Sequence, residues 1–214
     1  MPLLTTPFTI NGGCHCKRIR YRVNVPPFSE RPLTPYRTHG ADIGDLRVPA
    51  VYICHCNDCR ATTSAVISHG LVTVIDTVQA SVHDAASEPS EKDDGSRTWL
   101  PAAEIFGPSH PAALGLYKSS PGRSRWFCRH CGTSLAYSID AGVIPEEWGW
   151  PTMLDIWLGT VDRRDIEKDY MAPERMLWCE KGVPWIRRQA TKGAGGIPEH
   201  PLTMIDVLVA EQKH

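Results

Sequence analysis

Phe127-Cys128-Arg129-His130-Cys131-Gly132-Thr133 is the stretch of sequence that decides how this chain folds. Two cysteines separated by two residues place two thiolates on a tight turn, where both can bind one zinc ion. Gly132 follows directly, and glycine tolerates the positive φ that such a turn needs. The pattern therefore indicates a zinc knuckle whose other two ligands come from elsewhere in the chain.

The partner pair is expected in Gly12-Gly13-Cys14-His15-Cys16, which is distant in the sequence. Residues i and i+2 of an extended chain face the same side, so both thiols can point at one ion. Four thiolates close the coordination sphere of zinc, and in such a site the binding energy is folding energy. We predict that Cys14, Cys16, Cys128 and Cys131 bind a structural zinc ion. The alternative is a group of unligated, buried cysteines.

A second cluster, Cys54-His55-Cys56-Asn57-Asp58-Cys59, holds three cysteines and no fourth in the local sequence. Three thiolates leave one coordination position of zinc for water, a substrate or a distant protein group. Cys54, Cys56 and Cys59 are therefore predicted to hold a second, catalytic zinc ion, which makes two zinc ions per chain. Cys179, the remaining cysteine, is either a small core residue or the ligand that closes this site.

The charge of the second site narrows its chemistry. Three thiolates around Zn²⁺ leave a net charge of about −1, so the ion is a weaker Lewis acid than one held by three neutral histidines. A soft incoming ligand such as a thiolate suits this centre better than a hydrolytic water. The site is expected to activate a substrate thiol or to polarise the oxygen of a carbonyl or thiohemiacetal.

Candidate catalytic and substrate-binding residues lie near the clusters in the sequence. His55 and His69 are the nearest groups whose ordinary pKa suits proton transfer at neutral pH. Each has a simpler interpretation, because His55 can point outward and His69 can be a satisfied residue of an apolar strand. Arg60, Arg123 and Arg125 could bind a substrate carboxylate through paired hydrogen bonds, unless they are solvated surface arginines.

Composition limits the function classes. The chain has 214 residues, 42% of them hydrophobic, with a formal net charge of -1, so one globular domain is expected. No overall positive field exists to attract nucleic acid or a membrane surface. The sequence shows neither a signal-peptide pattern nor an apolar run long enough to span a membrane, which predicts a cytoplasmic protein. Disulfides are disfavoured there, so the paired cysteines favour metal binding.

Short strands dominate the predicted secondary structure. Ile19, Tyr21, Val23 and Val25 alternate with polar residues, a period of two that indicates a half-buried strand. Similar runs recur before and after the cysteine clusters, and no segment keeps a 3.6-residue period for long. We predict an all-β fold of small antiparallel sheets with few short helices. The runs lie at 48–53, 65–75, 114–117, 125–127, 135–139 and 153–158.

Two segments differ in composition from the rest. Residues 76–111 are rich in Ser, Glu, Asp, Lys, Pro and Gly, which predicts a polar surface insertion. Apolar residues at its far end, from Trp99 to Phe106, either anchor it to the core or form a lid. Residues 189–214 are expected to be a Gly-rich linker and C-terminal tail, so the predicted domain covers residues 10–188.

The order of these motifs resembles the glutathione-dependent formaldehyde-activating enzyme (Gfa) and centromere protein V family. The resemblance extends from Ile10 to Arg188 and includes the late pair Pro184-Trp185. It implies a fold of small β-sheets clamped by metal, with one structural and one catalytic zinc. The matching stretches are Gly12-Gly13-Cys14-His15-Cys16, Cys54-His55-Cys56-Asn57-Asp58-Cys59-Arg60, Lys118-Ser119-Ser120, Phe127 to Leu135, and Leu158-Gly159-Thr160-Val161-Asp162.

For activity, the resemblance implies a zinc-dependent carbon-sulfur lyase that joins glutathione, or another thiol, to formaldehyde as S-hydroxymethylglutathione. In the family a Ser or Thr after the second cluster is commonly followed by Gly, whereas Thr63 is followed by Ser64 here. Both residues are candidates for substrate binding. Two alternatives stay open: a divergent zinc enzyme acting on a larger carbonyl compound, and a non-catalytic zinc module that binds another protein.

Overall fold

The structure is a computed structural model that describes residues 3–33, 47–83 and 97–192. The chain divides into two units, Met1–Gly182 and Val183–His214. Every strand in the described residues belongs to the first unit, and the second unit contains one described helix, α4 (Pro184–Lys192). No helix in the described part of the chain is both long and apolar enough to cross a membrane.

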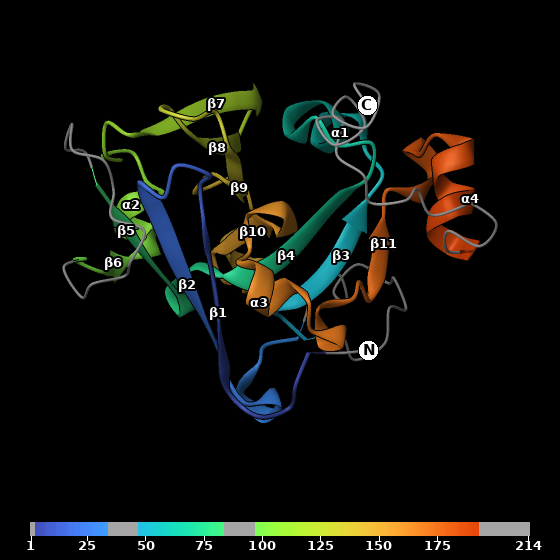
Figure 1. The fold of residues 1–214 in the computed structure, drawn as a ribbon, viewed down its shortest axis with the longest axis horizontal. Helices are drawn as coiled ribbons and strands as arrows, with labels where there is room; N and C mark the ends of the chain where they lie inside the picture. The colour runs from blue at the N-terminus through green and yellow to red at the C-terminus, as the bar shows by residue number, and fades with distance from the viewer. Residues whose placement is uncertain (1–2, 34–46, 84–96, 193–214) are drawn as a thin grey trace, which may run out of the picture. The chain divides into compact units, whose positions relative to one another are not determined.

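The fold is mainly β, as the sequence predicts. The larger sheet has seven strands in the order β11-β3-β4-β10-β9-β8-β7. All its neighbours are antiparallel except β11 and β3, which run parallel and side by side in Figure 1. Its strands are β3 (Ala50–Cys54), β4 (Ser68–Val74), β7 (Leu114–Ser120), β8 (Arg123–Cys128), β9 (Ser134–Ile139), β10 (Met153–Trp157) and β11 (Arg175–Leu177).

The smaller sheet has four antiparallel strands in the order β1-β2-β5-β6. In β2, buried residues alternate with partly exposed ones, so one face packs on the core and the other meets solvent. The strands are β1 (Phe8–Gly13), β2 (Ile19–Val25), β5 (Val78–Val82) and β6 (Leu100–Pro101).

Helices are short and mostly connect strands. α1 stands where β3 ends and β4 begins, next to the second cysteine cluster (Figure 1). The α-helices of the first unit are α1 (Asn57–Thr63), α2 (Ala102–Ile105) and α3 (Arg163–Ile166). The 3₁₀ turns are η1 (Phe28–Glu30), η3 (Ile75–Thr77), η4 (Glu146–Trp148), η5 (Leu158–Thr160), η6 (Asp169–Met171) and η7 (Cys179–Lys181).

One hydrophobic core joins the two sheets. Ile10 and Val23 of the smaller sheet belong to the same buried cluster as Leu71 and Ile156 of the larger one. Burying such side chains contributes about 1.5–3 kcal/mol each to the free energy of unfolding. The buried Tyr21 hydroxyl also hydrogen-bonds to Thr160 Oγ1 at 2.8 Å, which satisfies a polar group inside this core.

The predicted strands are confirmed, and four further strands, β1, β5, β6 and β11, were not predicted. β1 contains two glycines, and β11 has only three residues, so neither gives a clear alternating pattern. β5 lies inside 76–111, the segment expected to be a surface insertion. The difference arises because both ends of that segment are apolar enough to enter the core, through β5 and through α2.

The far end of the 76–111 segment is anchored to the core. Ile105 and Phe106 are buried in the main core, and the Phe106 ring packs edge-on against Trp126. The Trp99 ring lies under the Arg22 guanidinium, 3.7 Å from it. Residues 84–96 and 193–214 lie outside the described residues. Of the predicted linker and tail, only the end of α4 is described.

Candidate metal centres and the adjoining cavity

The first cysteine group ties the two sheets together. Cys14 and Cys16 lie in the turn between β1 and β2, while Cys128 ends β8 and Cys131 stands in the following turn. The four sulfur atoms all lie within 4.8 Å of one another. Gly132 has φ +73°, the left-handed conformation that the sequence predicts for this turn. The two cysteine pairs, one from each end of the predicted domain, therefore come together, as the sequence predicts.

The sulfur positions fit a tetrahedral metal site. With Zn–S bonds of about 2.3 Å, the edge between two sulfurs of a tetrahedron is about 3.8 Å. The observed Sγ–Sγ distances are 3.5 Å between Cys14 and Cys16 and 3.7 Å between Cys16 and Cys128. A disulfide needs about 2.05 Å, and all eight cysteines are free. The group can thus hold a metal ion such as zinc.

Surrounding groups act differently on these sulfurs: burial raises the pKa values of Cys14 and Cys128, whereas hydrogen bonds favour the thiolate of Cys131. The Ile19 amide donates to Cys14 Sγ at 3.3 Å. The Thr133 hydroxyl contacts Cys131 Sγ at 3.1 Å. Although burial raises the pKa of Cys131, its hydrogen bond with Thr133 helps to lower that pKa to about 6. Metal ligation requires thiolates, so this environment suits a closed metal site.

The second cysteine group lies at the junction of β3 and α1. Cys54 is the last residue of β3, Cys56 caps the N-terminus of α1, and Cys59 lies in its first turn. Their three sulfurs also lie within 4.8 Å of one another, with 3.4 Å between Cys54 and Cys56. A strand that runs directly into a capped helix folds the chain sharply enough to bring three ligands together. The predicted three-cysteine group is therefore formed.

Within this second group, Cys56 favours the thiolate form. The hydrogen bond with Cys56 raises the pKa of Cys54, and the pKa of Cys59 is raised to about 11, because the lowering effect of Cys54 is outweighed by its contact with Cys56 and its burial. Hydrogen bonds from Cys54 and Cys59 lower the pKa of Cys56 well below its ordinary value. The Cys59 backbone amide also donates to Cys56 Sγ at 3.3 Å, because Cys56 is the N-cap of α1. A thiolate at a helix N-terminus is further stabilised by the helix dipole. The group is thus suited to a soft metal ion.

Arg125 places a buried positive charge beside this group. It comes from β8 and is only 7% exposed. Its Nη1 donates to Cys59 Sγ at 3.5 Å, its Nε donates to Ser119 Oγ at 3.1 Å, and its guanidinium lies 4.4 Å from the centre of the Tyr137 ring. A buried cation needs a compensating negative charge, and the thiolates provide one. Arg125 therefore acts on the cluster as a charge-compensating neighbour.

A large cavity adjoins the second group and not the first. Its volume is about 710 Å³, within the range of small-molecule sites. Cys54, Cys56 and Cys59 line it, whereas none of the four cysteines of the first group does. The apolar part of the lining consists of Val48, Ala50, Val51, Val72, Ile139, Ile144, Trp150, Met153, Met176, Leu177 and Trp178.

Tyr52 and Asp155 form a polar pair in the same cavity. The buried Tyr52 side chain packs against Cys54 and Cys59, and its hydroxyl donates to Asp155 Oδ2 at 2.7 Å. Burial raises the pKa of Asp155 from 3.8 to about 6. Gly70 makes room for the phenol, because a Cβ there would lie 2.5 Å from Tyr52 Cζ. Asp155 can therefore gain and lose a proton near neutral pH.

Of the residues proposed from sequence for catalysis and substrate binding, Arg123 and Arg125 line the cavity, and the others do not. His55 is buried, and its backbone amide donates to Leu177 O at 3.0 Å. His69 lies half-buried on β4, where burial lowers its pKa. Arg60 is exposed on α1. Neither His55 nor His69 lines the cavity.

Thr63 and Ser64 lie at the end of α1, away from the cavity lining. Thr63 Oγ1 donates to Cys59 O at 2.7 Å and contacts Ser68 Oγ, so it fixes the helix that carries Cys59. Ser64 has φ +54°, the left-handed conformation of a helix C-cap. That conformation explains why glycine suits this position, and here a serine adopts it.

Sequence reasoning missed Tyr52, Asp155 and the two cavity tryptophans. Asp155 has no motif around it, and only the pairing of β3 with β4 and of β4 with β10 brings it next to Tyr52. A signal was present in the sequence, since an aspartate amid the apolar run Met153–Trp157 is unusual inside a buried strand.

Cys179 takes no part in either metal group. It is half-buried in η7, and its Sγ contacts Met176 O at 3.6 Å. Among the described residues, no fourth histidine, cysteine, aspartate or glutamate joins the ligand atoms of Cys54, Cys56 and Cys59. All three of these cysteines line the cavity.

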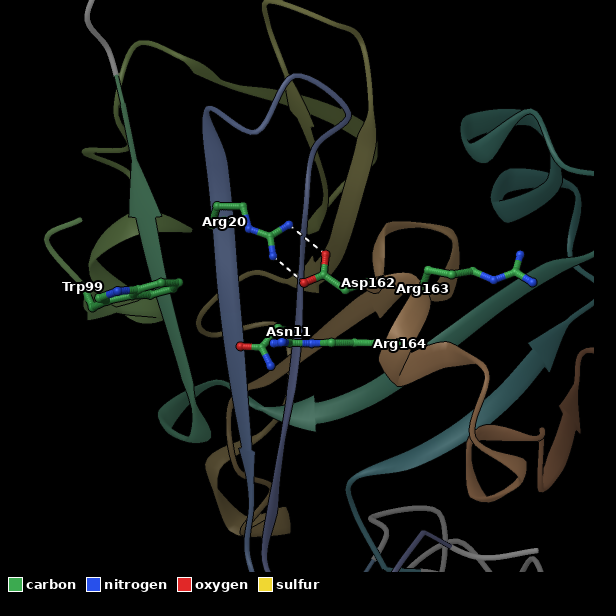
Figure 2. A pocket seen from close by; sticks show the side chains of 6 residues that line it. All are labelled: Asn11, Arg20, Trp99, Asp162, Arg163 and Arg164. Atoms are coloured by element: carbon green, nitrogen blue, oxygen red, sulfur yellow. Dashed lines mark hydrogen bonds and ion pairs between the residues drawn. The ribbon is translucent and has the colours of Figure 1, made fainter. Parts of the chain in front are cut away.

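A second hollow, of about 450 Å³, is lined by Asn11, Arg20, Trp99, Asp162, Arg163 and Arg164 (Figure 2). Most of its charged side chains form ion pairs within the protein. Arg20 binds both carboxylate oxygens of Asp162, at 2.9 and 2.5 Å. Arg163 is paired with Glu167. This hollow holds no cysteine and does not adjoin a metal group.

Comparison with known proteins assigns no family. No family model matches the chain, and no curated protein matches it. Among solved structures, the chain is similar to a Rhodobacter sphaeroides protein known from a crystal structure. The two are 15% identical, the match covers 78% of this chain and 98% of the other, and the TM-score is 0.35. At that level of likeness, neither fold nor function can be transferred.

Proposed function

We propose that this protein is a zinc-dependent enzyme of the Gfa type, which makes or breaks a carbon-sulfur bond in an adduct of a thiol and an aldehyde. One observation carries the proposal: of two cysteine groups able to hold a metal ion, the one with three ligands adjoins the 710 Å³ cavity. The group with four lies outside that cavity and joins two sheets. This arrangement is expected for one catalytic and one structural site.

Zinc bound by Cys54, Cys56 and Cys59 would supply a Lewis acid and a soft site for sulfur. The protein's own residues do the rest. The apolar walls exclude water from the reacting groups, which strengthens charge interactions there. Arg125 compensates the negative charge of the thiolates through its contact with Cys59. Tyr52 holds the Asp155 carboxyl group in one orientation through its hydrogen bond.

Asp155 is the proposed proton carrier. In the synthetic direction the substrate sulfur, as a thiolate, attacks the aldehyde carbon, and the carbonyl π electrons move to oxygen. Protonated Asp155 gives its proton to that oxygen, so a C–S bond and an O–H bond form. In the reverse direction the Asp155 carboxylate removes the hydroxyl proton, the C=O bond forms again, and the C–S bond breaks. A pKa near 6 suits both directions at neutral pH.

The proposal is tested by metal analysis and by turnover. Elemental analysis of the purified protein should find two zinc ions per chain, and one in Cys56→Ser. The wild-type protein should accelerate formation of thiol–aldehyde adducts, followed by NMR of the carbonyl carbon, with glutathione plus formaldehyde and a panel of other thiols and aldehydes. Cys56→Ser should fold and lack this activity. Absence of acceleration with every pair, in protein carrying both zinc ions, would refute the proposal.

A rival candidate is a non-catalytic zinc module that binds another protein. It requires the second metal to be closed by a fourth protein ligand. X-ray absorption spectroscopy at the zinc edge separates the two, because four sulfurs at both sites favour the module. Three sulfurs and a lighter ligand at one site favour the enzyme. The absence of a fourth candidate ligand among the described residues supports the enzyme.

A further inference from the structure

We propose that the cavity binds a small molecule with an aromatic or otherwise apolar body and a single carboxylate, in preference to glutathione. This inference rests on the proposed function, since it names the substrate class for the reaction at Cys54, Cys56 and Cys59. It is carried by three features of the cavity: its apolar walls, an exposed and strained tryptophan at its edge, and a pair of arginines on one strand.

The walls are apolar on both sides of the cysteines. Val51 and Val72 come from β3 and β4, and Met176 and Leu177 from β11. Ile139 and Met153 add apolar surface from β9 and β10. An aldehyde as small as formaldehyde needs no such volume. Glutathione has two carboxylates, an ammonium group and two peptide groups, and burying such groups is unfavourable unless each finds a partner. The charged lining residues Asp58, Arg175 and Lys181 are exposed, so they lie toward solvent and not among the apolar walls. An apolar ligand is favoured.

Trp178 is the strongest single indication. Its backbone has φ +58°, a left-handed conformation that is rare and strained for a bulky residue. Trp178 is 62% exposed, so packing within the protein does not compensate for this backbone strain. Strained residues of this kind cluster at ligand sites. Because Trp178 lines the cavity, its exposed ring is available to stack on an aromatic ligand.

Arg123 and Arg125 supply the part of the cavity that would bind the ligand's carboxylate. They stand two residues apart on β8, so their side chains leave the same face of the strand, and both line the cavity. Arg125 is engaged with Cys59, while Arg123 Nη1 donates to the backbone oxygen of Gly122 at 3.2 Å. Within the described part of the chain, neither guanidinium forms an ion pair with a carboxylate. A ligand carboxylate fits there through paired hydrogen bonds.

Binding to the zinc-loaded full chain tests the inference by isothermal titration calorimetry. The probes are 2-mercapto-3-phenylpropanoate, its primary amide and glutathione. We expect the aromatic acid to bind at least tenfold more tightly than glutathione, and the amide to bind about tenfold more weakly than the acid. If glutathione binds as tightly as the aromatic acid, or the amide binds as tightly as the acid, the inference is wrong.

Variants connect the preference to the residues. Trp178→Gly should weaken binding of the aromatic acid about tenfold and leave glutathione unchanged. Its melting temperature should stay the same or rise, because glycine suits a left-handed backbone, so a loss of affinity cannot be ascribed to unfolding. Tyr117→Ala removes another exposed aromatic ring, outside the cavity lining, and should change nothing. Unchanged affinity in Trp178→Gly would overturn the inference.

A ligand without sulfur separates this inference from the proposed reaction. 3-Phenylpropanoate lacks a thiol, so its binding depends on the walls and on Arg123 but not on the metal. If it binds the wild type and is weakened by Trp178→Gly and Arg123→Gln, the substrate class holds even where no adduct formation is found. If the protein turns over glutathione and formaldehyde but binds neither aromatic acid, the reaction holds and the substrate class is refuted.

Discussion

Replacing Asp155 with asparagine should make the protein more stable and less active. Asp155 is buried in the larger sheet beside Tyr52, and burial raises the pKa of its carboxyl group from 3.8 to about 6. A carboxyl group whose pKa is raised by folding contributes stability that is fully present below pH 3.8. That contribution is lost as the pH rises through 6. At neutral pH the buried Asp155 carboxylate therefore lowers the free energy of unfolding. An asparagine at this position has no charge and does not lower it.

The magnitude follows from the two pKa values. The difference between 3.8 and 6 corresponds to about 3 kcal/mol of unfolding free energy once the carboxyl group is fully ionised. Asparagine still accepts the hydrogen bond from Tyr52, but a neutral acceptor is weaker than a carboxylate by about 1 kcal/mol. We expect a net gain of about 2 kcal/mol at pH 8. Between pH 5 and pH 8 the advantage should grow by about 1.4 kcal/mol.

Urea unfolding of the zinc-loaded protein at several pH values between 5 and 8 measures this difference. Asp140→Asn is the matched control. The pKa of Asp140 is lowered by hydrogen bonds from Lys118 and Ser124, so its stability contribution is lost only as the pH falls below its ordinary value. The difference between Asp140→Asn and wild type should thus be constant from pH 5 to pH 8. A constant difference for Asp155→Asn as well would refute the reasoning.

Three further predictions address the metal groups and the packing around them. Cys128→Ser should unfold the protein or lower its melting temperature sharply, whereas Cys56→Ser should keep the fold; equal losses by circular dichroism would contradict separate structural and catalytic sites. Arg125→Met should lower the zinc affinity of the second site about 10- to 100-fold in a chelator competition, whereas Arg60→Met, at an exposed position, should leave it unchanged. Unchanged zinc affinity in Arg125→Met would mean that the contact with Cys59 does not tune the site. Gly70→Ala should lower the free energy of unfolding by about 1–3 kcal/mol in urea, because the added methyl group collides with the Tyr52 ring, and wild-type stability would show that the ring can move aside.

The sequence was most informative where ligands are close together along the chain. The three cysteines of the second group stand within six residues, so one strand-to-helix turn is enough to bring them together. The strands with alternating apolar residues could be predicted equally well, because a half-buried strand requires an apolar residue at every second position. Strands without that pattern, β1 and β11, escaped prediction. β5 escaped because its surroundings are polar in sequence although it pairs with β2 in space.

The proposed proton carrier, Asp155, could not be chosen from the sequence. His55 and His69 have suitable ordinary pKa values, but the structure gives them no place in the cavity lining. Asp155 becomes a candidate only after folding, when burial raises its pKa and Tyr52 donates a hydrogen bond to it. The pKa of Asp155 thus differs from that of an ordinary aspartate only because of the surroundings that folding gives it.

Cysteine spacing by itself determined that two metal groups should exist and which residues belong to each, because ligand pairs on one turn share a fixed geometry. The alternation of apolar residues determined a mainly β chain. Only the tertiary structure decided that the three-cysteine group adjoins a large apolar cavity, and that Arg125, Asp155 and Trp178 meet there. These residues come from different strands and turns, and strand pairing over long sequence separations, which local pattern does not encode, sets their distances.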